Sequence, residues 1–217
     1  MEFLTSDYDL VLKAFWLTLQ LAVLSGIASL LLGTLLGAMR VSPVSVLRRA
    51  ASVYVALIRN TPLLIVFVFV FIAAPTLGWF VDTPFVVTGV IALSIYTSAF
   101  VCEAVRSGIN AVPVGQAEAA RAIGMTFGQS MRQVILPQAF RAVVPPLASV
   151  LIALAKNTSV AAAFGLMEAT ARMRYFTNDN ADDRPMIFLV FAIGYIIIVE
   201  IMSAGAITLE RRWRTAR

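Results

Sequence analysis

Long apolar segments that carry almost no charge are the feature that most restricts how this chain can fold. Hydrophobic residues make up 60% of the 217-residue sequence and charged residues only 13%, which is far from the composition of a soluble domain. A helix needs about 20 apolar residues to cross a bilayer. The chain therefore has room for about five or six spans, and we expect an all-α, polytopic membrane protein with about five spans and one membrane domain over residues 12–207.

The apolar runs indicate where these spans lie. In chain order, the predicted spans cover residues 12–39, 63–80, 85–105, 143–167 and 186–207. Residues 44–58 have a moderately amphipathic pattern that is typical of a helix at the membrane interface. Thr61 and Pro62 are typical of a helix N-cap followed by a first-turn proline. Residues 168–185 are predicted to form a polar loop.

Small residues recur at every fourth position within the first span. Ser25, Ser29, Gly33 and Gly37 therefore share one stripe of the predicted helix. Lipid supplies no hydrophobic force between helices, so such stripes allow the close backbone approach on which helix packing in membranes depends. We expect this stripe to be a packing surface rather than a ligand site.

Basic residues are concentrated on one side of the predicted membrane. That side holds Arg40, Arg48, Arg49, the arginines of residues 112–141, and the tail residues Arg211, Arg212, Arg214 and Arg217. The opposite side mixes basic residues with acids, namely Lys13, Arg172, Arg174 and Arg184 with Glu2, Asp7, Asp9, Asp82, Glu168, Asp179, Asp182 and Asp183. The positive-inside rule then predicts an N-terminus outside the cell and a C-terminus in the cytoplasm.

Several classes of function are disfavoured by residue types that the sequence lacks. It has no histidine and a single cysteine, Cys102 in an apolar span, which leaves no internal disulfide and argues against zinc, haem or iron–sulfur sites. No phosphate-binding loop with glycines and a Lys-Ser/Thr pair is present. The net charge of +5 does not indicate nucleic-acid binding, because the arginines flank apolar spans. We expect no catalytic residue, cofactor or metal in this chain.

Residues 112–141 are the only long segment between apolar spans with a clear pattern. Residues 114–122 are rich in alanine and predict a short helix that ends before Gly124, and residues 125–136 predict a second helix. Pro137 then opens the next element. Two short helices around a glycine, held at both ends by membrane spans, form a rigid projection that is suited to docking outside the membrane.

The same segment resembles the EAA loop of type-I ABC importer permeases. The resemblance rests on Glu118-Ala119-Ala120, then Gly124, then Ile135-Leu136-Pro137. The flanking runs YTSAFVCEAVRSGIN and LIALAKNTS are similar to the polar amino-acid uptake subfamily, and Arg59-Asn60-Thr61-Pro62-Leu63 is similar to its Arg-x-Thr-Pro-Leu motif. The run Met39-Arg40-Val41-Ser42-Pro43, with YTSAFV and GQAEAAR, most resembles actinobacterial glutamate permeases.

This resemblance implies a bacterial plasma-membrane protein (cell inner membrane) that works as the permease of an ATP-driven importer. It implies that ATP and magnesium are bound by a separate ABC ATPase dimer, that a second permease chain (identical or a sister chain) completes the pore, and that an extracytoplasmic solute-binding protein delivers the substrate. The residues that would contact the ATPase are Glu118, Ala119, Ala120, Arg121, Gly124, Met125 and Phe127. The implied substrate is glutamate or another polar amino acid.

Lys156 interrupts the fourth span with a charge and is followed by Asn157 and Thr158. A charged group near the middle of a bilayer costs a few kcal/mol and usually faces a wet cavity or a partner. Prolines at 145 and 146 weaken this helix, and transporters use interrupted helices to face substrates. The substrate path is therefore predicted to contain Lys156, Asn157, Thr158, Tyr96, Thr97 and Ser98. The alternative is that Lys156 pairs structurally with Glu200 or Glu103.

Two further features keep other interpretations open. Glu103 and Arg106, three residues apart, would share one helix face and form a local ion pair, and Arg59 and Asn60 would anchor the chain at the interface. A passive channel or ion-coupled carrier is the alternative to an ABC permease, although neither would provide a partner for residues 112–141. A membrane scaffold protein is a further alternative, disfavoured by the polar residues around Lys156.

Overall fold

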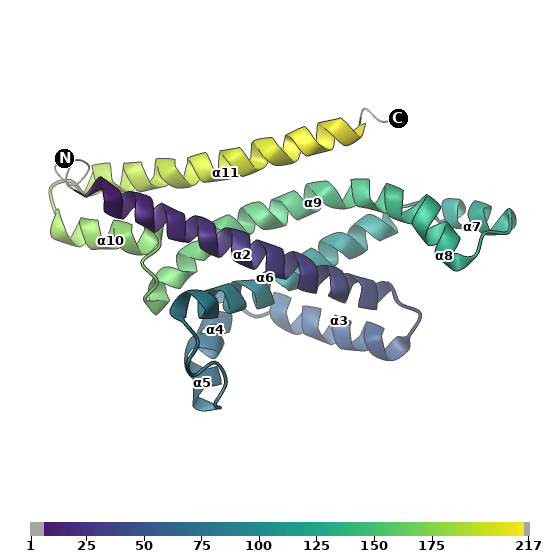
Figure 1. The fold of residues 1–217 in the computed structure, drawn as a ribbon, viewed down its shortest axis with the longest axis horizontal. Coiled ribbons are helices and arrows are strands. Elements are labelled where there is room, and N and C mark those ends of the chain that lie inside the picture. Colours follow the sequence, from purple (N-terminus) through teal and green to yellow (C-terminus); the bar gives the residue numbers. More distant parts are fainter. Residues whose placement is uncertain (1–6, 215–217) are drawn as a thin grey trace.

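The structure, a computed structural model, describes residues 7–214 (Figure 1). Glu2 and Arg217, which entered the charge count, lie outside these residues, as do the side chains of Arg212 and Arg214. Every regular element between residues 7 and 214 is helical. The helices are α2 (Tyr8–Val41), α3 (Ser45–Arg59), α4 (Leu63–Val68), η1 (Phe69–Ala73), α5 (Ala74–Thr76), α6 (Phe85–Asn110), α7 (Val114–Ala122), α8 (Phe127–Ser130), η2 (Met131–Ile135), α9 (Leu136–Asn157), η3 (Thr158–Phe164), α10 (Ala169–Asp179) and α11 (Arg184–Arg214).

Four helical stretches in the described chain are long and apolar enough to cross a membrane: Tyr8–Val41, Phe85–Asn110, Phe127–Phe164 and Arg184–Thr208. A fifth crossing requires α3 and α4–α5 together, a pair bent by 106°. Residues 63–76 alone would reach only about 21 Å at 1.5 Å per residue, short of a hydrocarbon core of about 30 Å. The all-α, polytopic fold is confirmed, and a fifth crossing is present only if this bent pair counts as one span.

The N-cap predicted at Thr61 is wrong. Pro62 occupies the cap position of α4, and the Thr61 hydroxyl donates instead to the carbonyl oxygen of Leu57 at 2.8 Å. The reason lies in α3, which continues to Arg59 and leaves the carbonyl groups of its last turn without helical partners. Thr61 thus completes the end of α3 and not the start of α4.

The small-residue stripe predicted on the first span is confirmed as a packing surface. Ser25 and Ser29 are fully buried, and α2 has its most extensive helix contact with α6. A Cβ atom added at Gly33 would lie 2.5 Å from Cβ of Val101 and 2.7 Å from the carbonyl oxygen of Ser98, both on α6. The close approach of α2 and α6 therefore requires a residue without a side chain at position 33.

The second half of the chain departs from the sequence prediction in two ways. The prolines at 145 and 146 do not break α9, which continues as an α-helix to Asn157 before tightening into the 3₁₀ turns of η3. The predicted polar loop over 168–185 contains the helix α10. A buried carboxylate at Glu168 caps that helix, a device that the composition of the loop does not reveal.

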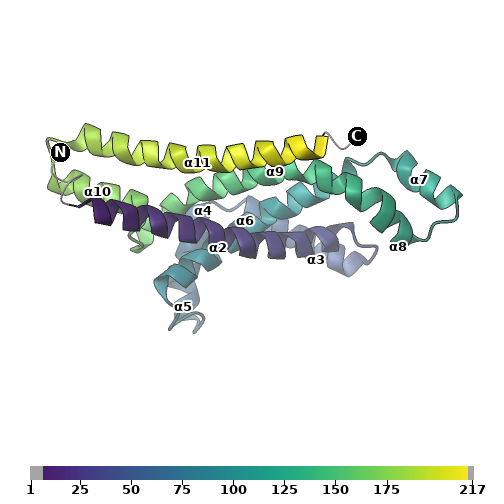
Figure 2. The same cartoon turned by 45° about the horizontal axis from the view of Figure 1, so that its top comes forward.

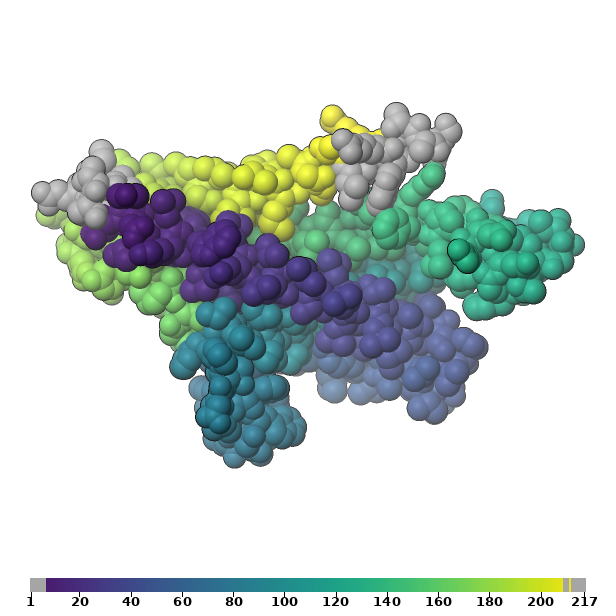
Figure 3. All heavy atoms as spheres, in the orientation of Figure 1, coloured from purple at the N-terminus to yellow at the C-terminus, as the bar shows by residue number. Residues whose placement is uncertain are grey.

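The two ends of the helical bundle carry different elements (Figures 1 and 2). The N-terminal end of α2 and the helix α10 lie at one end, whereas α7, α8 and the C-terminal end of α11 lie toward the other. Helix α11 runs along α9, with which it is in contact. In the space-filling view, the part that contains α7 and α8 projects beyond the bundle, and the part that contains α4 and α5 projects from its side (Figure 3).

Packing of α2 against α6 can be tested with Gly33→Ala, which adds only the atom that would collide with Val101 and Ser98. We expect the free energy of unfolding to fall by about 1–3 kcal/mol, the usual cost of overpacking. Gly205→Ala is the matched control, since no atom lies within 4 Å of a Cβ there, and it should be neutral or slightly stabilising. Thermal unfolding of both variants in one detergent measures the difference. Equal stability of the two would contradict the packing role.

Candidate functional site

The projecting segment has the helix–glycine–helix form that the sequence predicts. Helix α7 spans Val114–Ala122 as expected, and Gly124 has a φ of +83°. The amide of Met125 donates to the Ala120 carbonyl oxygen at 3.1 Å, so α7 ends in a glycine-dependent left-handed turn. The second helix begins at Phe127 rather than Met125, because Thr126 and Gln129 cap its start reciprocally.

The tip of this segment exposes large apolar side chains. Ile123 is 79% and Phe127 is 72% exposed, and both lie next to the Gly124 turn. Glu118, Ala119 and Arg121 are exposed as well. Two of the predicted contact residues differ: Ala120 is buried and Met125 is half-buried. The sequence prediction missed Ile123, whose exposure depends on the turn at Gly124 and not on its own residue type.

A cavity of about 270 Å³ lies between α6 and α9. It is lined by Tyr96, Thr97, Phe100, Ser149, Val150, Ala153 and Asn157. The hydroxyl oxygen of Thr97 is buried and has no hydrogen-bond partner among the described residues. A buried polar group left unpaired costs about 1–3 kcal/mol. Thr97 lines the cavity, but its hydroxyl oxygen is shielded from it, so a ligand or water would pair with this hydroxyl only after α6 and α9 move apart.

The structure brings together only some of the residues predicted for the substrate path. Tyr96, Thr97 and Asn157 line the α6–α9 cavity. Ser98 is fully buried, and its hydroxyl is 2.9 Å from that of Tyr54. Thr158, at the start of η3, is also fully buried and donates to the carbonyl oxygen of Ala155 at the end of α9 at 2.7 Å. Both of these hydroxyls already have hydrogen-bond partners, and neither residue lines the cavity.

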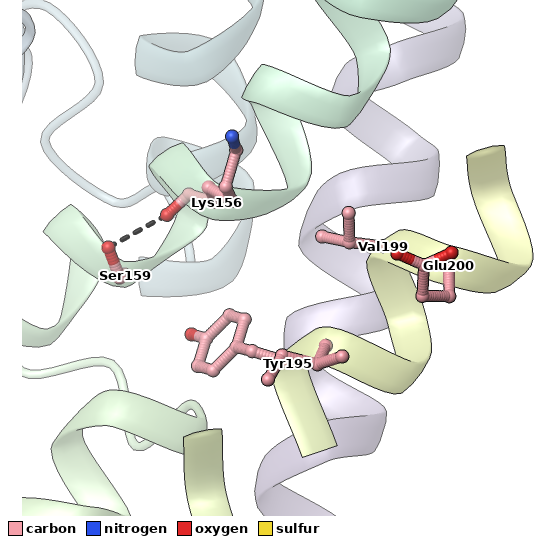
Figure 4. A pocket seen from close by; sticks show the side chains of 6 residues that line it. Lys156, Ser159, Tyr195, Val199 and Glu200 are labelled. Carbon is pink, nitrogen blue, oxygen red and sulfur yellow. Dashed lines mark hydrogen bonds between the residues drawn. The ribbon is translucent and has the colours of Figure 1, made fainter. Parts of the chain in front are cut away.

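Lys156 lines a second cavity, of about 380 Å³, with Ser159, Tyr195, Ile196, Val199 and Glu200. Figure 4 shows that the Lys156 side chain does not point toward Glu200. Lys156 is exposed and makes no ion pair with a described side chain, although Glu200 faces the same cavity. The alternative pairing with Glu103 is wrong, because the Glu103 carboxylate is held by three arginines.

These arginines form a charged cluster around Glu103, hereafter the Glu103 cluster. The predicted pair with Arg106 is confirmed, with Nη2 at 2.8 Å from Oε2. Arg40, from the last turn of α2, bonds to Oε1, and Arg59, from the end of α3, has Nη1 at 3.5 Å from the same oxygen. The guanidinium of Arg59 also lies 5.7 Å from the ring centroid of Phe100. The sequence predicted the pair with Arg106 because the two residues are close in the chain. It did not predict Arg40 or Arg59, which come from other helices.

Glu168 is a buried group that the sequence placed with the acids of a polar loop. Its carboxylate accepts hydrogen bonds from the amides of Thr170 and Ala171, each at 2.9 Å, and from the hydroxyl of Tyr195 at 2.8 Å. Burial raises the pKa of the Glu168 carboxyl, against the lowering effect of these hydrogen bonds. Because Tyr195 also lines the Lys156 cavity, this carboxylate connects the start of α10 to the wall of that cavity.

Comparison with known proteins places these features in a family. The family model described as "Binding-protein-dependent transport system inner membrane component" matches residues 29–215. The glutamate transport system permease protein GluC of Corynebacterium efficiens is 43% identical over 206 residues, 90% of each chain. GluC of Corynebacterium glutamicum is 41% identical over 213 residues, 93% of each chain. A crystal structure of an amino acid ABC transporter with histidines matches with a TM-score of 0.88 and 30% identity, over 96% of each chain.

These matches extend over the projecting segment, both cavities and the Glu103 cluster. They confirm the resemblance to actinobacterial permeases that the motifs around Glu118 and Lys156 indicate. With its several apolar helices, the chain is a multi-pass protein of the bacterial inner membrane. It belongs to the family of inner-membrane components of binding-protein-dependent transport systems.

Proposed function

We propose that the chain is the permease subunit of an ATP-driven amino-acid importer, with residues 12–207 as the permease domain and glutamate as its substrate. The projecting segment is the observation that carries this proposal, because its apolar tip, including Ile123 and Phe127, has no covering contact within the described chain. Apolar side chains at the tip of a rigid projection are typical anchors of a protein interface. The names of the two Corynebacterium relatives support glutamate.

In this function the chain performs no covalent chemistry. ATP and magnesium belong to a separate ABC ATPase dimer, which would hold Glu118, Ala119, Ala120, Arg121, Gly124, Met125 and Phe127 at its surface. A second permease chain, identical or a sister, would complete the pore, and an extracytoplasmic solute-binding protein would deliver the substrate. Closure of the ATPase dimer would move the projecting segments and switch the bundle between inward- and outward-facing states.

The substrate would be held inside the bundle by polar groups of α6 and α9. Thr97 and Asn157 line one cavity, and Lys156 directly precedes Asn157 on α9. Its ammonium carries the charge needed to attract the α-carboxylate of an amino acid entering between α9 and α11. A passive channel or ion-coupled carrier would use the same cavities but would leave the projecting segment without a role.

The proposed orientation places the N-terminus outside the cell and the projecting segment, with the C-terminus, in the cytoplasm. It is supported by the arginines gathered toward the end that carries α7 and α8 and by the positive-inside rule.

In a Cys102→Ala background, Asp179→Cys should react with a membrane-impermeant maleimide added to intact cells, whereas Gln129→Cys should react only in inverted vesicles. Both positions are exposed in the structure. The reverse labelling pattern would overturn the orientation and the ATPase contact together.

ATP-driven import can be tested with Gly124→Val in the complex reconstituted with its ATPase and loaded binding protein. A β-branched residue strongly disfavours a positive φ, so the turn between α7 and α8 should change and substrate-stimulated ATP hydrolysis should fall about tenfold, a loss of about 1.4 kcal/mol. Gly115→Val is the matched control, since it lies in the same segment, has equally open surroundings and has no positive φ. Full stimulation of the Gly124 variant would remove the segment from coupling. Absence of any stimulation by amino acids in the unmodified complex would refute the import function.

Attraction of the substrate carboxylate by Lys156 predicts that Lys156→Met lowers uptake by about tenfold, equivalent to about 1.4 kcal/mol. Folding and basal ATP hydrolysis should persist, because this side chain has no ion-pair partner to strand among the described residues. Lys13→Met, which removes a charge paired with Asp9 at 2.6 Å, is the control and should keep full uptake. If Lys156→Met is destabilised and a second change at Glu200 restores both stability and uptake, the lysine is structural.

A further inference from the structure

A third cavity lies beside the one that contains Thr97. It has a volume of about 390 Å³ and is lined by Arg40, Ser52, Val55, Ala56, Arg59, Asn60, Phe100 and Glu103. Phe100 lines both cavities, so a single aromatic side chain stands between them. A molecule with one end on Thr97 and Asn157 would therefore point its other end toward the Glu103 cluster.

The charges of this cavity do not balance. Three guanidinium groups, from Arg40, Arg59 and Arg106, share the single carboxylate of Glu103. Arg40 and Glu103 each expose only 19% of their side chains. Arg106 and Arg59 expose 37% and 46% of their side chains, so the excess positive charge is only partly withdrawn from water, and an anion in the cavity would compensate it. The cavity therefore favours an anionic group, and a carboxylate matches the planar, forked arrangement of guanidinium donors.

Arg59 is the member of the cluster best placed to hold such an anion. Its Nη1 lies 3.5 Å from Glu103, compared with 2.8 Å for Nη2 of Arg106, and 46% of its side chain is exposed. Its guanidinium lies 5.7 Å from the ring centroid of Phe100, the residue that separates the two cavities. Arg59 can therefore turn to a new carboxylate while Arg40 and Arg106 keep Glu103 neutralised.

We propose that Arg59 and the surrounding Glu103 cluster form the subsite that binds the side-chain carboxylate of an acidic amino acid. The backbone groups of that amino acid would lie in the α6–α9 cavity, with Thr97 and Asn157. This proposal rests on the function proposed above and adds the group that distinguishes acidic from neutral substrates. Arg59 is then a specificity residue, not an interface anchor.

The test compares binding of radiolabelled glutamate and glutamine, two amino acids of nearly equal shape that differ in side-chain charge. Binding is measured on the assembled permease–ATPase complex without the binding protein, so that the selectivity belongs to the permease. For Arg59→Gln we expect glutamate affinity to fall about tenfold or more, the loss of one charge-assisted hydrogen bond, while glutamine affinity stays unchanged. Arg48→Gln is the control, since Arg48 lies on the same helix, is exposed and bonds only to the Ser42 and Pro43 carbonyl oxygens in the structure.

Arg59→Lys keeps the charge and removes the forked geometry, so it should lower glutamate affinity less than Arg59→Gln does. If Arg59→Gln does not assemble, Arg59→Lys carries the test through a selective loss of glutamate over glutamine. Equal loss of both amino acids, or no loss, would show a structural cluster and overturn the subsite while leaving import intact. If the unmodified complex binds neither amino acid and its ATP hydrolysis does not respond to them, the import function fails as well, which separates the two conclusions.

Discussion

The close packing of α2 against α6 is the contact on which the rest of the structure depends. Helices in lipid gain no hydrophobic stabilisation from meeting each other, so they are held by close contact and by interhelical polar groups. The missing side chain at Gly33 brings the backbones together. Two turns further along α2, the same approach brings Arg40 to Glu103 on α6. A charge that would be unfavourable in an isolated span thus gains its partner only because the stripe of small residues precedes it.

The Glu103 cluster in turn holds together the region around the bent pair formed by α3 and α4–α5. Arg59 ends α3 where the chain turns by 106°, and its contact with Glu103 attaches that turn to α6. The hydroxyl of Tyr54, one turn before Arg59, donates to the Ile95 carbonyl oxygen at 2.9 Å. Helix α3 is therefore fastened to α6 by polar contacts from two successive turns. These contacts keep Phe100 between the two cavities, so the geometry of the proposed substrate site follows from the packing of the bundle.

Local patterns in the sequence predicted the elements that local physics determines. The stripe at Gly33, the helix that ends before Gly124 and the pair of Glu103 with Arg106 each depend on residues within a few turns, and each is confirmed. Some failures are local, since Thr61 does not cap α4 and the second helix of the projection begins at Phe127, but the larger ones are long-range. Glu168 is acidic and lies in a polar stretch, yet it is fully buried and accepts hydrogen bonds from Tyr195 and two amides, and Arg59 pairs with Glu103 on another helix. No periodicity within one segment contains that information, because it depends on which helices come to lie side by side.

The helix that carries the polar residues of the proposed path is the same one that starts at the projecting tip. From Phe127 to Phe164 the chain forms one helical stretch of 38 residues, about 57 Å at 1.5 Å per residue, with Asn157 near its far end. The cap formed by Thr126 and Gln129 fixes its start, so a displacement of the tip would enter the helix at Phe127. Its two irregular places are the π-helical turn at Met131–Ile135 and the 3₁₀ turns from Thr158. Because a wider or tighter turn bends more readily than a regular α-helix, the regular part between them moves as a unit. In the proposed importer, that unit would deliver motion of the ATPase contact to the cavity lined by Thr97 and Asn157, where the substrate would be held or released.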